Sequence, residues 1–248
     1  MSGRRTFIQK TAAISTAAVL PAALKGQSKK RDAMKILVTG GHPDDPETGA
    51  GGTIRKLTDA GHQVYILYLT KGEAGIPGTA FDQAAEIRER EAKQACSILA
   101  AEPLFLGQVD GSTRVTNEWY SKILDLMREI QPHAIFTHWP VDTHRDHRHC
   151  SLLTYDAWLS SERNAAFYYY EVVSGYQTMS FRPTHYVDIT TVAQQKWDAC
   201  FAHESQKIRE SYPQHHGKME DFRGRENNCQ YAEAFIHLDS SPYIGLPV

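Results

Sequence analysis

The sequence has few cysteines, and none of them has the paired spacing of a zinc ribbon. The 248 residues contain four, Cys96, Cys150, Cys200 and Cys229. No two of them form a Cys-x-x-Cys pair, which excludes a ribbon, and their spacing assigns no disulfide pairing. The helical His-Glu-x-x-His motif of metalloproteases is absent as well. Any metal site is therefore expected to use histidine and carboxylate side chains.

Acidic residues are absent from the first 31 positions, whereas the rest of the chain is acidic. Residues 1–31 carry seven of the 27 basic residues and none of the 29 acidic ones. The remaining chain therefore has 20 basic residues against 29 acidic ones. An acidic body argues against nucleic acid as a partner, because the phosphate backbone attracts basic surfaces.

The sequence also lacks an apolar run that fits a membrane-spanning helix. An Ala-rich stretch, Thr11–Leu24, is too short to span a bilayer and follows the paired Arg4 and Arg5. This arrangement resembles a twin-arginine export signal, and a basic tail is the alternative. We therefore expect residues 1–31 to be an export signal with a linker and residues 32–248 to form one domain. The protein is then periplasmic or secreted, without a stable membrane anchor.

The body of the chain alternates between apolar strand patterns and helical patterns. Strands are predicted at residues 34–40, 62–70, 103–107, 133–137 and 184–189, and helices at 47–60, 82–101, 117–130, 147–160 and 190–210. Residues 217–228 are polar and are predicted to form a loop, and residues 231–238 a strand or a short helix. Such alternation is typical of βαβ units. We therefore expect an α/β fold, a Rossmann-like three-layer sandwich with a mainly parallel sheet.

Two groups of histidine and aspartate follow two of the predicted strands. His42, Asp44 and Asp45 come directly after the first strand. The second group follows the strand at 133–137 and comprises His138, Asp142, His144, Asp146, His147 and His149. In open α/β sheets ligands bind beyond the carboxyl ends of the strands, so the two groups are expected to converge.

The side chains of these two groups suit a catalytic metal. Imidazole and carboxylate ligands favour Zn²⁺, and a catalytic zinc usually has three protein ligands and a water. An aspartate left beside the metal would serve as general base, and a histidine as an acid or electrophile. The sequence therefore predicts a metal-dependent active site.

The two motifs, His-Pro-Asp-Asp at 42–45 and Asp-x-His-x-Asp-His at 142–147, resemble the PIG-L, or LmbE-like, family of zinc-dependent N-acetylglucosaminyl deacetylases. Further landmarks cover about residues 35–236 in the same order: Gly51-Gly52, Thr70–Gly75, Arg88 with Glu91, Val187–Thr190, His203–Gln206 and Tyr231–Phe235. The resemblance implies a hydrolase that removes an acetyl group from an N-acetylated amino sugar of the GlcNAc type, either free or in a glycan.

The resemblance also implies roles for His42, Asp44 and Asp45 of the first motif. His42, Asp45 and, from the second motif, His147 are expected to bind Zn²⁺ or another divalent metal. Asp44 is expected to be the general base that takes a proton from the metal-activated water.

The remaining expected roles lie in the second motif and the second helix. His144 is expected to stabilise the oxyanion, Asp146 to orient that histidine, and Arg88 to contact the substrate. The commoner family pattern has glutamate directly after the two aspartates. Here Pro46 stands between them and Glu47, which leaves open a direct role for Glu47.

Two other functions and one structural alternative stay open at this level. The same fold could hold a glycan without cleaving it, although Asp44 and His144 are needed only for catalysis. A non-sugar amide is a second alternative substrate. Three consecutive tyrosines, Tyr168, Tyr169 and Tyr170, form either a platform for a sugar ring or part of the core. The sequence does not indicate an oligomeric state.

Overall fold

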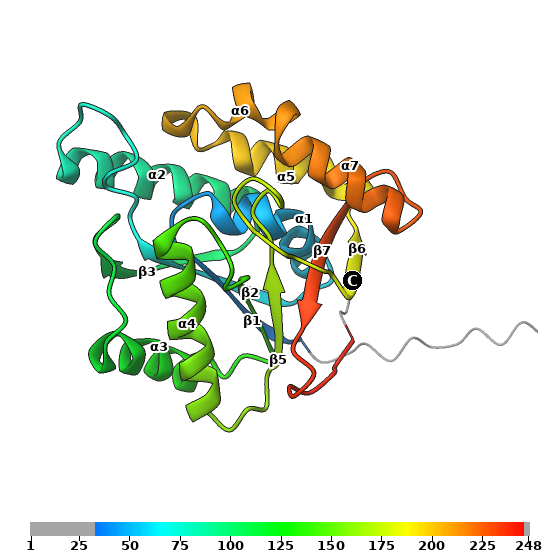
Figure 1. Ribbon diagram of the computed structural model, residues 1–248, viewed down its shortest axis with the longest axis horizontal. Helices are drawn as coiled ribbons and strands as arrows, with labels where there is room; N and C mark the ends of the chain where they lie inside the picture. Colours follow the sequence, from blue (N-terminus) through cyan, green and yellow to red (C-terminus); the bar gives the residue numbers. More distant parts are fainter. Residues whose placement is uncertain (1–32, 246–248) are drawn as a thin grey trace, which may run out of the picture. The chain divides into compact units, whose positions relative to one another are not determined.

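The computed structural model describes residues 33–245, and the predicted export signal and linker lie outside them. One seven-stranded sheet forms the centre of this part of the chain (Figure 1). Its strands are β1 Lys35–Gly40, β2 Gln63–Thr70, β3 Glu102–Gln108, β4 Ala134–His138, β5 Ala166–Tyr170, β6 His185–Asp188 and β7 Ala232–His237. They lie in the order β3-β2-β1-β4-β5-β7-β6.

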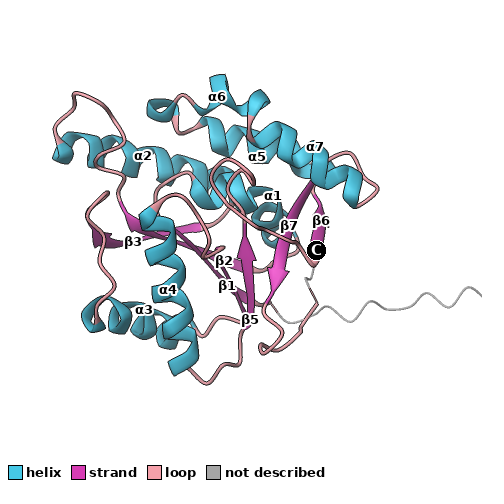
Figure 2. Cartoon of the chain, viewed as in Figure 1, coloured by secondary structure: helices cyan, strands magenta, loops and turns pink. Residues whose placement is uncertain are grey.

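Helices cover both faces of this sheet (Figure 2). They are α1 Asp45–Asp59, α2 Phe81–Leu99, α3 Asn117–Ile130, α4 Arg145–Ser160, α5 Ala193–Phe201, α6 Ile208–Ser211 and α7 His216–Glu226. Helices α3 and α4 lie on one face, and α1, α2, α5 and α7 on the other. The expected three-layer α/β architecture is therefore confirmed. In residues 33–245 no helix has the length and apolar character needed to cross a bilayer.

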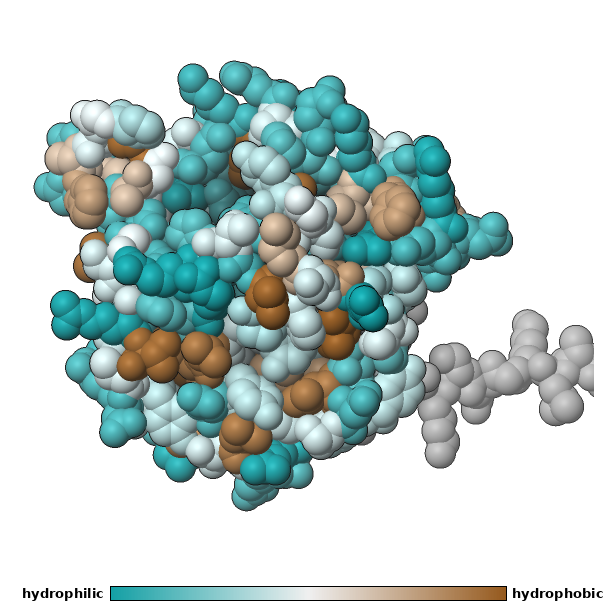
Figure 3. All heavy atoms as spheres, in the orientation of Figure 1, coloured by the Kyte–Doolittle hydropathy of each residue, from teal (hydrophilic) through white to brown (hydrophobic). Residues whose placement is uncertain are grey.

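The first five strands of the sheet are parallel, and only β7 pairs in the opposite direction, with β5 and with β6. The expectation of a mainly parallel sheet is thus confirmed. Because both faces are covered, the strands are apolar on both sides. In β1, Ile36 and Val38 pack in one core with α1 and α2, while Leu37 packs in the other with α3 and α4. The outer face in view is mainly hydrophilic, with apolar residues in small separate patches (Figure 3).

The glycines of α1 let this helix pack closely against its neighbours. A Cβ at Gly52 would lie 2.6 Å from Ile189, and one at Gly49 would overlap the Tyr170 ring. These contacts are closer than real Cβ atoms make, so larger residues would force the helix away from the sheet. The Gly51-Gly52 landmark therefore sets the position of the helix that begins at the two aspartates.

A buried cation ties α1, α5, α7 and β7 together. Lys196 is 1% exposed, and its Nζ lies 2.8 Å from Glu220 Oε1 and 2.7 Å from Glu233 Oε1. The Glu233 carboxylate also accepts hydrogen bonds from the Gly52 and Thr53 amides, at 2.8 and 2.7 Å. Although burial alone would lower the pKa of Lys196, the two carboxylates raise it above its usual range. The lysine is therefore charged in the folded protein.

Replacing Lys196 by methionine is expected to lower the free energy of unfolding by about 3–5 kcal/mol, because two carboxylates are left buried without their cation. Urea unfolding followed by circular dichroism measures the loss. Lys218→Met is the control, since Lys218 is exposed on α7 and contacts only Gln214 among the hydrogen bonds of the structure. Equal stability of the two variants would contradict the structural role of Lys196.

The prediction of one continuous helix at 190–210 is wrong, because the structure has α5 there at Ala193–Phe201 and only short helical pieces around it. After α5 ends at Phe201 the chain turns through His203 (φ −81°, ψ 62°) and Lys207, which has a positive φ of 52°. Between them the Glu91 carboxylate on α2 accepts the Ser205 amide and hydroxyl, at 2.8 and 2.7 Å. This contact from another helix takes up the Ser205 amide, which a continuous helix would use for a hydrogen bond within its own backbone.

The predicted loop at 217–228 is also wrong, because α7 occupies most of it. This helix has almost no apolar stripe, which is why periodicity missed it. Side-chain contacts hold it instead: Arg223 donates to both oxygens of Glu171, at 2.6 and 2.9 Å. Gly224 approaches the backbone of Gln230 so closely that a Cβ would clash. Residues 232–237, left open between strand and helix, form the strand β7.

Candidate active site

A cavity of about 300 Å³ lies where β1 and β4 end, and both aspartate–histidine groups reach it. Its lining includes His42, Asp44, Asp45, Asp110, His144 and His147. A larger hollow of about 560 Å³ lies at the amino ends of β4 and β5, where His133 and Glu162 are the only residues of metal-binding type among its lining. The chemistry of the side chains therefore places the candidate site in the smaller cavity.

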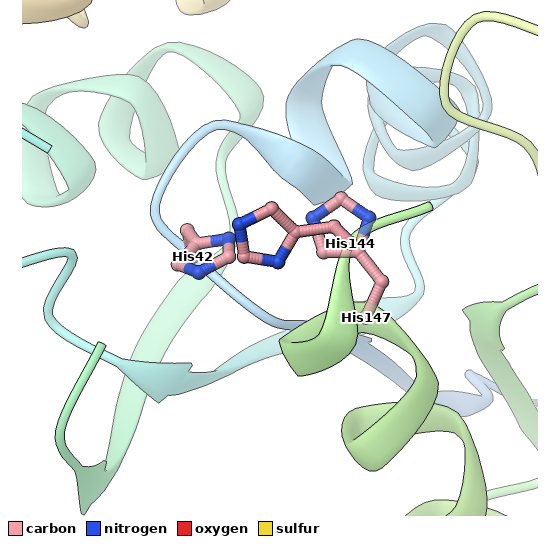
Figure 4. Close-up of side chains that lie close together, drawn as sticks. All are labelled: His42, His144 and His147. Atoms are coloured by element: carbon pink, nitrogen blue, oxygen red, sulfur yellow. The ribbon is translucent and has the colours of Figure 1, made fainter. Parts of the chain in front are cut away.

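Three imidazole rings meet in this cavity (Figure 4). His42 comes from the loop after β1, while His144 and His147 come from the start of α4. The centroid of the His144 ring lies 4.6 Å from that of His42 and 4.7 Å from that of His147. The predicted convergence of two segments a hundred residues apart is what the geometry shows.

Asp45 lies between two of these histidines. Its Oδ2 is 3.2 Å from His42 Nδ1, and its Oδ1 is 3.2 Å from His147 Nε2. Burial would raise the pKa of the Asp45 carboxyl, but the nearby His147 and His138 outweigh it and hold that pKa well below its usual range. The result is an ionised oxygen donor between two nitrogen donors.

The outward nitrogens of the same two histidines face carboxylates. His42 Nε2 lies 3.1 Å from Asp110 Oδ1 and 3.4 Å from Asp146 Oδ2, and His147 Nδ1 lies 3.3 Å from Asp142 Oδ1. A carboxylate on the far nitrogen fixes the tautomer and orientation of a ligating imidazole. The sequence analysis assigned no role to Asp110 or Asp142. Asp142 is the first residue of the second motif, and Asp110 follows β3, so strand-end position was the available signal.

His138 packs against His147 and is not among the residues that line the cavity. Its ring stacks on His147 at 4.0 Å, and its Nε2 accepts the Gly41 amide at 3.0 Å. Burial, with the charge of His147 adding to it, lowers the pKa of His138 to about 4. A neutral ring whose Nε2 is already occupied is a poor metal ligand, although Asp45, His138 and His147 bring donor atoms within 4.8 Å of one another.

Asp146 and His144 are adjacent but do not pair through their side chains in the contacts of the structure. The Asp146 carboxylate accepts from the Gly111 amide at 2.7 Å and the Thr113 hydroxyl at 2.6 Å. His144 Nδ1 instead accepts the backbone amide of Asp146, at 3.3 Å. This bond leaves the proton of a neutral His144 ring on Nε2, where it can be donated.

Asp44 occupies a strained backbone position at the start of α1. Its φ of 115° is rare for a residue with a side chain, and such strain is typical of functional sites. Arg88 Nη2 donates to Asp44 Oδ2 at 2.8 Å, and the same guanidinium donates to the carbonyls of Pro43 and Gly72. Burial raises the pKa of Asp44 to about 6, against the opposing effect of Arg88. Arg88 is 3% exposed, so the structure places it against the aspartate loop.

Glu47 lies fully buried beneath Asp44. Its Oε2 accepts the Asp44 amide at 3.2 Å, and its Oε1 accepts the Tyr68 hydroxyl at 2.5 Å and lies 3.2 Å from His203 Nε2. Pro46 fits in the first helical turn, where its missing N–H is not needed. The glutamate thus fixes the conformation of the loop that carries Asp44, in spite of the inserted proline.

The tyrosines of β5 do not form a sugar platform. Tyr168 and Tyr170 are 0% exposed, and Tyr169 is 8% exposed. The Tyr170 hydroxyl donates to the Thr39 carbonyl at 2.9 Å, beside the strand end that carries His42. Of the two alternatives, core packing is confirmed, because a central strand with both faces covered has no exposed side.

The donor set fits a metal ion of the zinc type. Three groups of side chains place nitrogen or oxygen donors within 4.8 Å of one another: His42 with His144 and His147, Asp45 with His138 and His147, and His42 with Asp110 and Asp146. His42, Asp45 and His147 do not form one such group, because Asp45 faces His42 with Oδ2 and His147 with Oδ1. All three are buried, and two nitrogens with one carboxylate oxygen are the donors that Zn²⁺ prefers. The site has no thiolate donor, because the four cysteines lie elsewhere as free thiols.

Comparison with known proteins identifies relatives of the chain. The sequence pattern of the PIG-L family, described as GlcNAc-PI de-N-acetylase, matches residues 37–158. The chain is 30% identical over 232 residues to the diacetylchitobiose deacetylase of Thermococcus kodakarensis, covering 84% of this chain and 86% of that protein.

Solved structures show the same fold. The N,N'-diacetylchitobiose deacetylase of Pyrococcus horikoshii superposes with a TM-score of 0.76 at 25% identity, covering 88% of this chain and 90% of that one. GalB of Pseudomonas putida KT2440, a 4-carboxy-2-hydroxymuconate hydratase, has a TM-score of 0.75 at 22% identity, covering 86% and 98%. The likeness to GalB extends to the fold alone, so the reaction must be argued from the site.

Proposed function

We infer the reaction of this protein from its family, because the chain belongs to the PIG-L family. It is an enzyme, a deacetylase that hydrolyses a linear amide. We propose that its substrate is an N-acetylated amino sugar of the GlcNAc type, and that acetate and the free amine are the products. The observation that carries the proposal is the meeting of Asp44 and the three-histidine cluster in one cavity.

We propose that His42, Asp45 and His147 hold the metal, with Zn²⁺ as the expected ion. Their donor atoms face one another, while Asp110, Asp146 and Asp142 face the outward nitrogens of the two histidines. The bound ion would supply a Lewis acid and lower the pKa of a water in the cavity.

The chain's own residues would then carry the protons. Asp44 takes a proton from the attacking water, because burial holds its pKa near neutrality, where a general base works best. Arg88 holds the Asp44 carboxylate in place. His144 donates from Nε2 to the oxygen on which negative charge develops, a contact of the kind worth about 3–4 kcal/mol. Asp44, now protonated, returns the proton to the leaving amine.

A substrate panel tests the proposal against its two alternatives. The metal-loaded protein is incubated with N-acetylated sugars and N-acyl amino acids, and released primary amine is measured. Amine from the sugars alone is the expected result. Amine from the amino acids alone would indicate a non-sugar amide hydrolase, and glycan binding without release would indicate a binding module.

Asp142→Asn is expected to weaken metal binding by about 10–100-fold, because the carboxylate that orients His147 is lost. Competition with a fluorescent chelator measures the affinity. The control is Asp156→Asn, an exposed aspartate on α4, the helix that carries His147. An unchanged affinity in Asp142→Asn would show that the carboxylate does not act on the metal site.

A further inference from the structure

One fully buried histidine next to the site takes no part in the chemistry proposed above. The His203 side chain is 0% exposed and belongs to the segment that follows α5. It is not among the residues that line the cavity. Neither of its ring nitrogens makes a hydrogen bond of ordinary geometry with another residue of the range 33–245. A buried polar ring in this state requires an explanation, because its desolvation is otherwise uncompensated.

A buried carboxylate lies beside this ring. His203 Nε2 is 3.2 Å from Glu47 Oε1, within ion-pair distance, and Glu47 is as fully buried as the histidine. Burial lowers the pKa of His203, but the Glu47 and Asp44 carboxylates outweigh it and raise that pKa above its usual value. The Tyr68 hydroxyl also donates to Glu47 Oε1 but brings no charge. His203 therefore supplies the positive charge that a buried carboxylate needs.

Glu47 in turn restrains the proposed general base. Its Oε2 accepts the Asp44 amide at 3.2 Å. The φ of 115° at Asp44 is a conformation that persists only where surrounding contacts enforce it. Arg88 binds the carboxylate of this residue, and Glu47 binds its amide. A Glu47 side chain without its cation would hold the amide less firmly, so the restraint on Asp44 depends on His203.

The break after α5 brings His203 to this position. Its backbone leaves the helix with φ −81° and ψ 62°. Two residues later, the amide and hydroxyl of Ser205 donate to the Glu91 carboxylate on α2. Arg88 lies on the same helix, about one turn before Glu91. Helix α2 therefore supports both contacts of Asp44: Arg88 directly, and Glu47 through the segment that carries His203.

We propose that His203 is a positioning residue of the deacetylase, which holds the Glu47 carboxylate and through it keeps the Asp44 backbone in the conformation that the reaction needs. The inference rests on the proposed function, because it takes Asp44 as the general base. It gives the second half of the chain a part in a site whose metal ligands and proton carriers come from residues 42–147. A misplacement of about 1 Å can cost about 10²-fold in rate, which sets the expected effect.

The first test is amine release from N,N'-diacetylchitobiose by metal-loaded wild type and His203→Ala. The variant is expected to lose about 100-fold in kcat, with KM within about threefold of wild type and full metal content, because the base is displaced while the ligands remain. His203→Gln keeps an N–H donor without the charge and is expected to recover about tenfold of this loss. Loss of the metal in parallel with kcat would overturn the proposal.

A double-mutant cycle with Glu47→Gln separates positioning through Glu47 from other effects of His203. Both single variants are expected to be slow, and the double variant to be no slower than the slower of the two, because both substitutions break one contact. Losses that multiply in the double variant would show that His203 acts independently of Glu47, against the proposal.

His237→Ala is the control for damage to the core. His237 is also a buried histidine, and its ring lies 5.0 Å from that of Tyr168. It is not among the residues that line the cavity. Its kcat is expected to stay within about twofold of wild type, because distant sites act independently. A loss in His237→Ala equal to that in His203→Ala would assign the effect to packing and reject the positioning role.

Hydrogen exchange at the Asp44 amide tests the restraint without any turnover. This amide is held by Glu47 and is expected to exchange faster in His203→Ala than in wild type or His237→Ala. If wild type released no amine from any N-acetylated sugar, the deacetylase proposal would fail. Faster exchange in His203→Ala would then still support the restraint of Asp44 by His203, whereas unchanged exchange would reject it.

Discussion

Asp44→Asn is expected to lower kcat about a thousandfold while the protein keeps its metal. Asparagine has nearly the shape of aspartate but cannot take a proton from water, and general-base catalysis typically contributes 10²–10⁴-fold. The amide can still accept the hydrogen bond from Arg88, and Asp45 keeps its contacts with His42 and His147. Initial rates of amine release and metal content by mass spectrometry are the two measurements.

The pair of measurements separates a role in proton transfer from a role in metal binding. Low activity with full metal content is the expected combination. Low activity with lost metal would make Asp44 a ligand, and activity close to wild type would remove it as the base. Asp59→Asn is the control, because Asp59 is exposed at the other end of the same helix.

His147→Ala is expected to lose the metal itself, and with it all activity above background. The imidazole supplies one of three proposed donors and also lies against Asp45, His138 and Asp142. Without the ring, only two of the three proposed ligands, Asp45 and His42, remain, and catalytic zinc sites normally need three. Metal content after dialysis is expected to fall from about one ion per chain to near zero.

The control for this variant is His133→Ala. His133 is exposed at the amino end of β4, whereas the site lies at the carboxyl end, and its Nδ1 accepts the Lys35 amide. Thermal unfolding with and without added Zn²⁺ excludes simple misfolding: His147→Ala is expected to unfold cooperatively, but without the rise in Tm that a bound metal gives wild type. Full metal occupancy in folded His147→Ala would contradict its role as a ligand.

Several elements of the fold were predictable because they follow strong local patterns. Strand β1 and helix α3 were predicted to within a residue, since an apolar run and a regular helical spacing identify them. The two strand ends then indicated where the histidines and aspartates meet, because parallel strands bring their carboxyl ends to one edge.

The missed features depend on contacts between distant segments. Helix α7 is stabilised by the contact of Arg223 with Glu171, which no local pattern reveals. The break after α5 depends on Glu91 from α2. Asp110 was missed because one aspartate after a strand is an ordinary loop residue until its distance to His42 is known.

The tyrosines of β5 show the same limit for function. In the sequence they formed a conspicuous aromatic group, but the structure buries them in the sheet.

The family, the α/β class and the two histidine and aspartate motifs of the site follow from the sequence, because motifs and local periodicity are readable in one dimension. Which atoms face one another, and which further side chains join the site, depends on the tertiary structure. In the folded protein Asp142 lies against His147 and Asp110 against His42. Glu47 accepts the Asp44 amide, and Arg88 donates to the Asp44 carboxylate. Such pairings join elements far apart in the chain, and only packing brings them within hydrogen-bonding distance.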